Sequence, residues 1–511
     1  MAEKSDDQLS EKVSFDTALD RAGFGLYSYI MTCLTGVSVI SFVCICYCST
    51  IIVPTSACEL ETTISQQGLL ASGPTVGSMI GGVVWGYLAD TRGRRKMMLA
   101  ALFGGVVFNL IASLSVNWVM LLIFQFIASS FGSGFYSMSM SLLSESVPVA
   151  KRNFVVLVVS SIFLLSQGLI SGLAIPISPM SFSHYLPALD IYWNSWRTLL
   201  ALYSVPSVIT FIWMIFMLES PKFVYVKGDT QKALEILRKI HKVNHWRSKE
   251  EFTVTGIIEA EEQVAEKSSA KDQIVPLFTS PLLKYTIIIT TLQAFKQVGA
   301  FLVWLPTIAD QFVRIVQTGE GSNLTMCNII EMDKPIDVDA VPCALDKISL
   351  LLVLGVGALT FLVNVVLTTV INKVGRRNMV IIVTGVCGVC GILINLVPNA
   401  YGSVVLFAIF STGIVVVGFY TAITVAIYPT HLRALAIALP MTLGRIGTFA
   451  SIQILNVMLA NSCDAGFYLF ACLFGSSAII ASFLPDDRRL QKPVNENKEE
   501  NVETSDENEK L

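Results

Sequence analysis

Two basic residues, Lys296 and Arg445, lie deep inside long apolar stretches of this chain. Each is more than ten residues from the end of its stretch, and at 1.5 Å per residue this is too deep for the side chain to extend to water. A charge at the centre of a membrane helix costs roughly 2.5–3.5 kcal/mol and is normally paired or in contact with water. The apolar stretches contain no carboxylate that could pair with either residue. We therefore expect a water-filled cavity whose positive potential attracts an anion.

Two amides accompany Lys296. Gln293 lies one helical turn before it on the same face, and Gln297 borders that face. An ammonium group beside amides suits the oxygens of a carboxylate, sulfate or phosphate. We predict that these three residues and Arg445 bind the substrate.

Each candidate also has a structural interpretation. Lys296 could bond to backbone carbonyls of a kinked helix, and Arg445 could have a packing role beside Gly444. Gln167 and Tyr420 also lie at the middle of apolar stretches and are further candidates for the cavity. Either could instead hold neighbouring helices together.

Two short basic strings occupy the same place in the two halves of the chain. Asp90–Lys96 (DTRGRRK) corresponds to Val374–Asn378 (VGRRN), and each is followed by a Pro-x-x-x-Arg element that ends at Arg152 or Arg433. The copies are offset by 282 residues at the glycine and by 281 at the proline. A repeat of that length is a whole domain.

The composition places both copies in a lipid bilayer. Of the 511 residues, 53% are hydrophobic and 14% charged, with a mean hydropathy of +0.65, outside the range of soluble proteins. The apolar runs are long enough to cross about 30 Å of hydrocarbon, and they are continuous, which favours helices over a barrel. The predicted spans are 24–50, 66–88, 97–115, 118–144, 154–177 and 198–218, then 283–308, 348–371, 378–397, 402–427, 432–458 and 466–484.

Lysine and arginine in the connections predict the orientation. The connections that carry the basic strings are expected on the cytoplasmic side, so both termini are expected there. The predicted order is a cytoplasmic segment 1–22, a six-helix bundle 23–218, a cytoplasmic linker 219–280 with an amphipathic helix, a second bundle 281–484 with an extracytoplasmic loop 312–346, and a disordered acidic cytoplasmic tail 485–511.

The loop 312–346 has features of an oxidising exterior. It contains a sequon at Asn323, where we predict glycosylation. It also contains Cys327 and Cys343, for which we predict a disulfide, with free thiols as the alternative.

Several strings resemble one family. Gly86–Lys96 resembles the signature between the second and third helices of the major facilitator superfamily. Strings that resemble its sugar-porter, organic-ion and synaptic-vesicle branches are Glu145–Arg152, Trp196–Arg197 and Leu218–Lys222. Asp16–Gly25 and Trp304–Pro306 resemble the synaptic vesicle glycoprotein and related-protein group.

The resemblance implies an all-α membrane protein with twelve transmembrane helices in two six-helix bundles, around a central cavity that opens alternately to either side. It places the seventh helix along the cavity, and an arginine in the eleventh helix resembles the arrangement in organic-anion transporters. It also implies that charged residues at the cytoplasmic face are conformational latches: Asp90, Arg94, Arg95, Glu145, Arg152, Glu219, Arg376 and Arg433. In the second copy Asn372 replaces the aspartate and Ala426 the glutamate of Glu145, so we predict a weaker latch there.

The predicted function is transport of a small organic solute, expected to be an anion, by alternating access, as facilitated transport or exchange. Two alternatives remain: a transport-inactive vesicle or membrane receptor or scaffold of the same fold, and a transporter of a neutral sugar-like solute. Since the chain has no phosphate-binding loop, metal cluster or nucleophile motif, we expect no enzyme activity and no cofactor. The expected partners are a small-molecule substrate and the lipid bilayer, and we expect no binding of nucleic acid. The protein is expected to be a monomer in the plasma membrane or a vesicle membrane.

Overall fold

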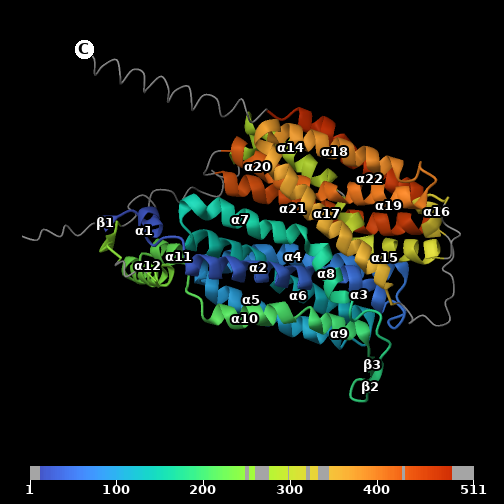
Figure 1. The fold of residues 1–511 in the computed structure, drawn as a ribbon, viewed down its shortest axis with the longest axis horizontal. Helices are drawn as coiled ribbons and strands as arrows, with labels where there is room; N and C mark the ends of the chain where they lie inside the picture. The colour runs from blue at the N-terminus through green and yellow to red at the C-terminus, as the bar shows by residue number, and fades with distance from the viewer. Residues whose placement is uncertain are drawn as a thin grey trace, which may run out of the picture. The chain divides into compact units, whose positions relative to one another are not determined.

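The computed structural model describes residues 12–247, 252–258, 275–296, 298–317, 323–331, 344–428 and 432–485, which are mostly helical (Figure 1). The chain divides into two compact units that correspond to its two halves. The described segment Thr63–Gly68 is an exception, because it belongs to the second unit.

Among the described residues, eleven helical stretches are long and apolar enough to cross a membrane, and one bent pair of helices can form a twelfth. Backbone groups in lipid must be hydrogen-bonded internally, so apolar runs of this length become helices. The spans of the first unit are α2 (Leu26–Cys46) with α3 (Ser49–Ser56), α4 (Ile64–Arg92), α5 (Arg94–Ser113), α6 (Trp118–Ser146), the pair α7 (Val149–Leu164) and α8 (Ser166–Ala174), and α9 (Ser195–Leu202) with α10 (Val205–Ile215).

The second unit repeats this order. Its spans are α14 (Leu282–Phe295) with α15 (Val298–Gln317), α17 (Lys347–Val374), α18 (Arg376–Leu393), α19 (Ala400–Ser411) with the 3-10 turn Thr412–Val415 and α20 (Val416–Ile427), α21 (Arg433–Asn461), and α22 (Cys463–Ser482). A short helix, α16 (Met326–Glu331), precedes α17.

Small residues let helices approach closely within each unit. A Cβ atom on Gly388 of α18 would lie 2.5 Å from the Cα of Gly475 in α22, so the two backbones meet there directly. Nearby, the ring of Phe301 packs against four other phenylalanine rings, with centroids 4.8–6.1 Å away. These contacts form the core of the second unit.

Several segments outside the spans of the first unit gather around α12 (Thr230–Asn244), which contacts α2. They are β1 (Lys12–Val13), α1 (Phe15–Arg21), α11 (Pro221–Val226) and β4 (Gly256–Ile257), and β1 pairs in parallel with β4 (Figure 1). A separate hairpin joins β2 (His184–Leu186) to β3 (Ile191–Trp193).

The predicted amphipathic helix of the linker is α12. It buries Leu234, Leu237 and Ile240, and on its exposed face Lys239 bonds to Glu235 at 2.7 Å, which lowers the pKa of that carboxyl group.

The side chain of Asn244 joins this linker helix to the first span. Its amide nitrogen donates to the carbonyls of Ala22 and Gly23 at 3.1 and 2.7 Å, and its oxygen accepts from the backbone N–H of Tyr27 at 2.9 Å. One side chain thus satisfies backbone groups on both sides of the turn that leads into α2.

Candidate functional site

The seventh span is broken at Lys296. Helix α14 ends at Phe295, Lys296 has φ −69° and ψ 52°, and α15 begins at Val298. A break leaves carbonyls at the end of one helix and N–H groups at the start of the next without intrahelical partners, and the N-terminal end carries partial positive charge. Broken helices of this kind form ion and solute sites in membrane proteins.

Helix α21 packs against this break. A Cβ atom on Gly444 would lie 3.1 Å from the Cβ of Gln293, and one on Gly299 would have the methyl group of Thr448 as its nearest neighbour at 3.9 Å. Arg445 lies within this stretch of α21, and its charge repels that of Lys296. The structure therefore brings Gln293, Lys296 and Arg445 into one region of the second unit.

These polar groups lack partners within the chain. Gln293 is only 3% exposed, and its Oε1 atom accepts no hydrogen bond. In the part of the chain that the structure describes, neither Lys296 nor Arg445 takes part in a hydrogen bond or ion pair. Two cations and an amide oxygen are thus available to a ligand. Of these groups only Gln293 is buried, and a hydrogen bond from a ligand would offset the roughly 1–3 kcal/mol that its unsatisfied oxygen costs.

Asp310 corrects the expectation that the apolar stretches contain no carboxylate. Helix α15 continues to Gln317, beyond the predicted end at 308, so Asp310 lies inside the seventh span and is 7% exposed. Its carboxylate accepts from the Nε of Arg314 and from the backbone N–H of Asp346, both at 2.8 Å. Fourteen residues separate it from Lys296, about 20 Å along a helix. Its charge therefore belongs to the end of α15 and not to the break.

Two further predicted cavity residues are described. Tyr420 on α20 of the second unit is 1% exposed, and its hydroxyl has no hydrogen-bond partner. Gln167 on α8 belongs to the first unit, where it is 7% exposed with an unpaired Oε1. Both stay predictions for the cavity. Gln297, Cys343 and the side chain of Arg433 lie outside the described residues.

In the first unit, an ion pair between Arg94 and Glu145 joins the start of α5 to the end of α6. The other carboxylate oxygen of Glu145 accepts from the hydroxyl of Ser220, which begins α11. Asp90 lies 3.5 Å from the same arginine, but its side chain is 72% exposed. Three segments of the first unit therefore meet at the carboxylate of Glu145.

Arg95 bonds differently from its neighbour. Its backbone N–H donates to Glu219 at 2.9 Å, whereas its guanidinium donates to the carbonyls of Met214 and Ile215 at the end of the sixth span. The turn before it requires Gly93, which has φ +104° and lies so close to Glu219 that a Cβ atom would be 2.9 Å from the carboxylate. Another predicted latch residue, Arg152, has a buried Nε without a partner.

The second unit contains a related arrangement, in which two arginines donate to backbone carbonyls. Arg377 donates to the carbonyl of Ser482 at the end of the twelfth span, as Arg95 does at the end of the sixth. Arg376 donates to the carbonyl of Ala422 at 3.1 Å, one turn before Ala426, the residue in place of a glutamate.

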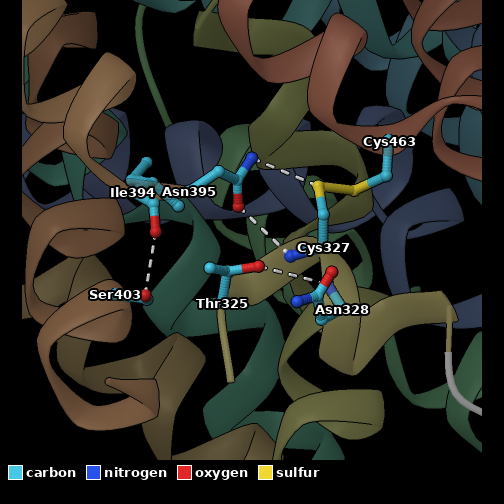
Figure 2. The surroundings of a disulfide bond; sticks show 7 residues. All are labelled: Thr325, Cys327, Asn328, Ile394, Asn395, Ser403 and Cys463. Carbon is cyan, nitrogen blue, oxygen red and sulfur yellow. Dashed lines mark hydrogen bonds between the residues drawn. A yellow bond between two sulfur atoms is a disulfide. The ribbon is translucent and has the colours of Figure 1, made fainter. Parts of the chain in front are cut away.

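Cys327 forms a disulfide with Cys463, so the predicted pairing of Cys327 with Cys343 is wrong. Figure 2 shows the bond beside Asn395, whose side chain accepts from the backbone N–H of Cys327 and donates to its sulfur, both at 3.2 Å. The prediction considered only the nearer cysteine in the loop, whereas the fold brings the start of α22 to α16. Cys463 itself lies in a short connection free of lysine and arginine, a signal that it belongs to the same side of the membrane.

The structure also describes a predicted glycosylation site and a further disulfide-bonded cysteine outside the spans. Asn323 is exposed, as glycosylation requires, and Cys58 is also disulfide-bonded.

Comparison with known proteins agrees with this arrangement of helices. Residues 35–452 match the family model described as the Major Facilitator Superfamily. The human protein SVOPL is 24% identical over 94% of this chain and 93% of its own length. The Caenorhabditis elegans proton myo-inositol cotransporter hmit-1.1 is 28% identical, over 52% of this chain and 44% of its own.

The solved structure of a D-xylose-proton symporter superposes with a TM-score of 0.65 at 14% identity, over 90% of this chain and 99% of that one. At this identity the similarity concerns the fold alone. Together with the family match, it confirms the predicted twelve-span fold of two six-helix bundles.

Proposed function

We propose that this chain, which belongs to the Major Facilitator Superfamily and is a multi-pass membrane transporter, moves a small organic anion by facilitated transport or exchange. The observation that carries the proposal is the pair of cations without a partner, Lys296 at the break of the seventh span and Arg445 on the helix packed against it.

The electrostatics of this pair favour an anionic solute. Two like charges that repel in a partly desolvated region are stabilised when an anion binds between or beside them, since attraction is screened less there than in water. The N–H groups at the start of α15 add partial positive charge next to Lys296. The paired carboxylate of Asp310 is too far along α15 to neutralise this region.

The amide of Gln293 indicates a second property of the solute. Its unpaired atom is an acceptor, so it suits a hydroxyl or amine donor on the solute, while the cations suit a carboxylate or another anionic group. A small organic acid that also carries a donor, such as a hydroxy acid, matches both requirements.

The neutral-solute alternative rests on the same amide. The relative hmit-1.1 is a proton myo-inositol cotransporter, and hydroxyl groups of a polyol could bond to Gln293 without using either charge. A transport-inactive receptor or scaffold of the same fold is the third candidate.

Uptake by the purified full-length protein in proteoliposomes distinguishes these functions. A panel of labelled hydroxy acids, dicarboxylates, sulfated compounds and neutral polyols is offered at equal concentration. We expect uptake of at least one anion, and competition for it by other anions but not by polyols. Uptake of polyols alone favours the neutral-solute transporter, and no uptake of any compound favours the scaffold.

The charged clusters at the ends of the spans have a different role in this proposal. The Arg94–Glu145 cluster and its counterpart at Arg376 and Arg377 are conformational latches at the cytoplasmic ends of the two bundles. They hold neighbouring helices of one bundle together and do not contact the solute. Both termini are then cytoplasmic, in a plasma membrane or vesicle membrane.

A further inference from the structure

A cavity of about 200 Å³ lies inside the second unit, between α15, α17 and α19. We name it the α17 cavity. All of its lining residues are apolar, and they include Leu305 on α15, Leu351 and Gly355 on α17, and Phe407 on α19. None of the candidate solute-binding residues belongs to it. An apolar cavity offers no hydrogen-bond partners and does not hold ordered water.

Gly355 leaves this cavity open. A Cβ atom at this position would meet no heavy atom within 4 Å, so no neighbouring helix requires a glycine there. At Gly388, by contrast, a Cβ atom would lie only 2.5 Å from the Cα of Gly475. Glycine is a poor helix former compared with alanine, and here its absent side chain contributes only space.

The wall of the cavity includes a surface that faces lipid. Helix α17 is the most apolar of the described spans, with a mean hydropathy of 2.6, and only 22% of an 18-residue stretch within Lys347–Ile371 is buried. Leu351, on the cavity wall, is 46% exposed, and Ile348, one turn before it, is 50% exposed. Gly355 follows one turn later and is also exposed. An occupant can therefore enter from among the lipid chains.

Polar contacts and a short helix lie near the cavity at the end of α17 nearest the loops. Asp310 bonds to the backbone N–H of Asp346, directly before α17. Met326, the first residue of α16, lines the cavity, and the next residue is Cys327, fixed by its disulfide to Cys463 (Figure 2). Among the described residues, the exposed side of α17 therefore offers a route of entry.

We propose that the α17 cavity binds an acyl chain of a bilayer phospholipid. Lys347, the first residue of α17, is exposed one turn before Leu351, where its ammonium group can pair with the phosphate of the same lipid. This charge at the rim favours a phospholipid over a sterol, which has no phosphate. The site is independent of the proposed solute and of the residues that bind it.

Photolabelling of the full-length protein in lipid nanodiscs tests the proposal. The probe is a phosphatidylglycerol with a diazirine near the end of one acyl chain, and labelled peptides are located by mass spectrometry. We expect label on residues 305–312 and 351–359. Gly355→Leu fills the cavity and should lower that labelling several-fold.

The matched control is Gly172→Leu. Gly172 lies in α8 of the first unit, and a Cβ atom there also meets nothing within 4 Å, so labelling of the α15 and α17 peptides should stay unchanged. Ala408→Phe fills the cavity from α19 and should reproduce the loss if Gly355→Leu does not fold. Lys347→Gln should reduce labelling less than the filling variants do, because it removes only the phosphate contact.

Equal labelling of these peptides in the parent and in a folded filling variant overturns the proposal. Labelling of the same peptides by a photoactivatable sterol, without labelling by the phospholipid, overturns the choice of occupant. Both readouts are binding measurements, so a failure of the transport proposal leaves them unaffected.

Discussion

Arg376 holds in the second unit the position that Arg94 holds in the first, yet the two guanidinium groups bond to different kinds of acceptor. Arg94 pairs with the carboxylate of Glu145, and Arg376 donates to the carbonyl of Ala422. The fourth helix of the second unit has Ala426 where the first has its glutamate. The first latch therefore depends on the ion pair between Arg94 and Glu145, whereas the second unit has no glutamate at position 426 to form the equivalent pair.

This difference predicts the effect of Glu145→Gln. The change removes one charge from a pair whose side chains are only 17% and 12% exposed, so we expect the free energy of unfolding to fall by about 1–3 kcal/mol. Thermal unfolding in detergent measures it. Glu235→Gln is the matched control, since its pair with Lys239 is exposed and should contribute little. Equal effects of the two changes would contradict the importance of the Glu145 pair.

Asp90→Asn should affect the transport cycle without affecting stability. The carboxylate of Asp90 is mostly exposed and 3.5 Å from Arg94, so the unfolding free energy should change by less than about 0.5 kcal/mol. We expect slower turnover with an unchanged half-saturation concentration, because Asp90 belongs to the cluster around Arg94 and is not one of the candidate solute-binding residues. Initial uptake rates over a range of solute concentrations give both quantities. A raised half-saturation concentration with normal turnover speaks against a latch.

Lys296→Gln tests the anion site most directly. The change keeps a polar group of similar size and removes the charge, so uptake of the identified anion should fall steeply. Lys296→Arg should retain part of the activity, since the charge stays while the compact ammonium becomes a planar fork. The control is Lys284→Gln, an exposed lysine near the start of the same helix α14. Full anion transport by Lys296→Gln at normal surface levels would make a neutral solute bound at Gln293 the better interpretation.

Removal of the Cys327–Cys463 disulfide should destabilise the second unit. The bond closes a loop with a sequence separation of 136 residues, and the chain-entropy model gives about 4–5 kcal/mol for loops of this order. Cys463→Ser should therefore unfold at a lower temperature than the parent. Peptide mapping without reduction should recover a Cys327–Cys463 cross-linked pair in the parent protein. A parent in which both thiols are free would contradict the assignment.

Asn323→Gln tests the topology. Asn323 is exposed and is predicted to lie on the non-cytoplasmic side, so it should account for the N-linked glycan of the protein. Electrophoresis before and after glycosidase treatment gives the result. A mobility shift that persists in the variant would show that a different loop is glycosylated and that the predicted orientation is wrong.

The positions of most membrane spans could be predicted from the sequence, because a long apolar run in a bilayer must satisfy its backbone hydrogen bonds internally and so forms a helix. The end of the seventh span was placed too early. Asp310 and Arg314 looked like residues of a loop, whereas α15 contains both and pairs them one turn apart. Polar residues of this kind can be assigned to a helix and not to a loop only when their ion-pair and hydrogen-bond partners are known.

The candidate site was partly predictable. Depth within an apolar run identified Lys296 and Arg445 from residue type and position alone. The break at Lys296 was not predicted, since its backbone angles depend on how α21 packs against Gln293 through Gly444. The disulfide was mispredicted for a similar reason, because sequence distance favoured Cys343 while the fold brings Cys463 to Cys327.

The hydrogen bonds of Asn244 attach α12 to the entrance of the first helix within one unit. The linker helix is therefore a rigid extension of the first bundle on the side of its basic string. A fluorescent label or an antibody fragment bound on its outer face, at Lys239 for example, will turn as that bundle turns. The orientation of such a label in a single molecule would follow the working cycle in real time without any change to the membrane-spanning residues.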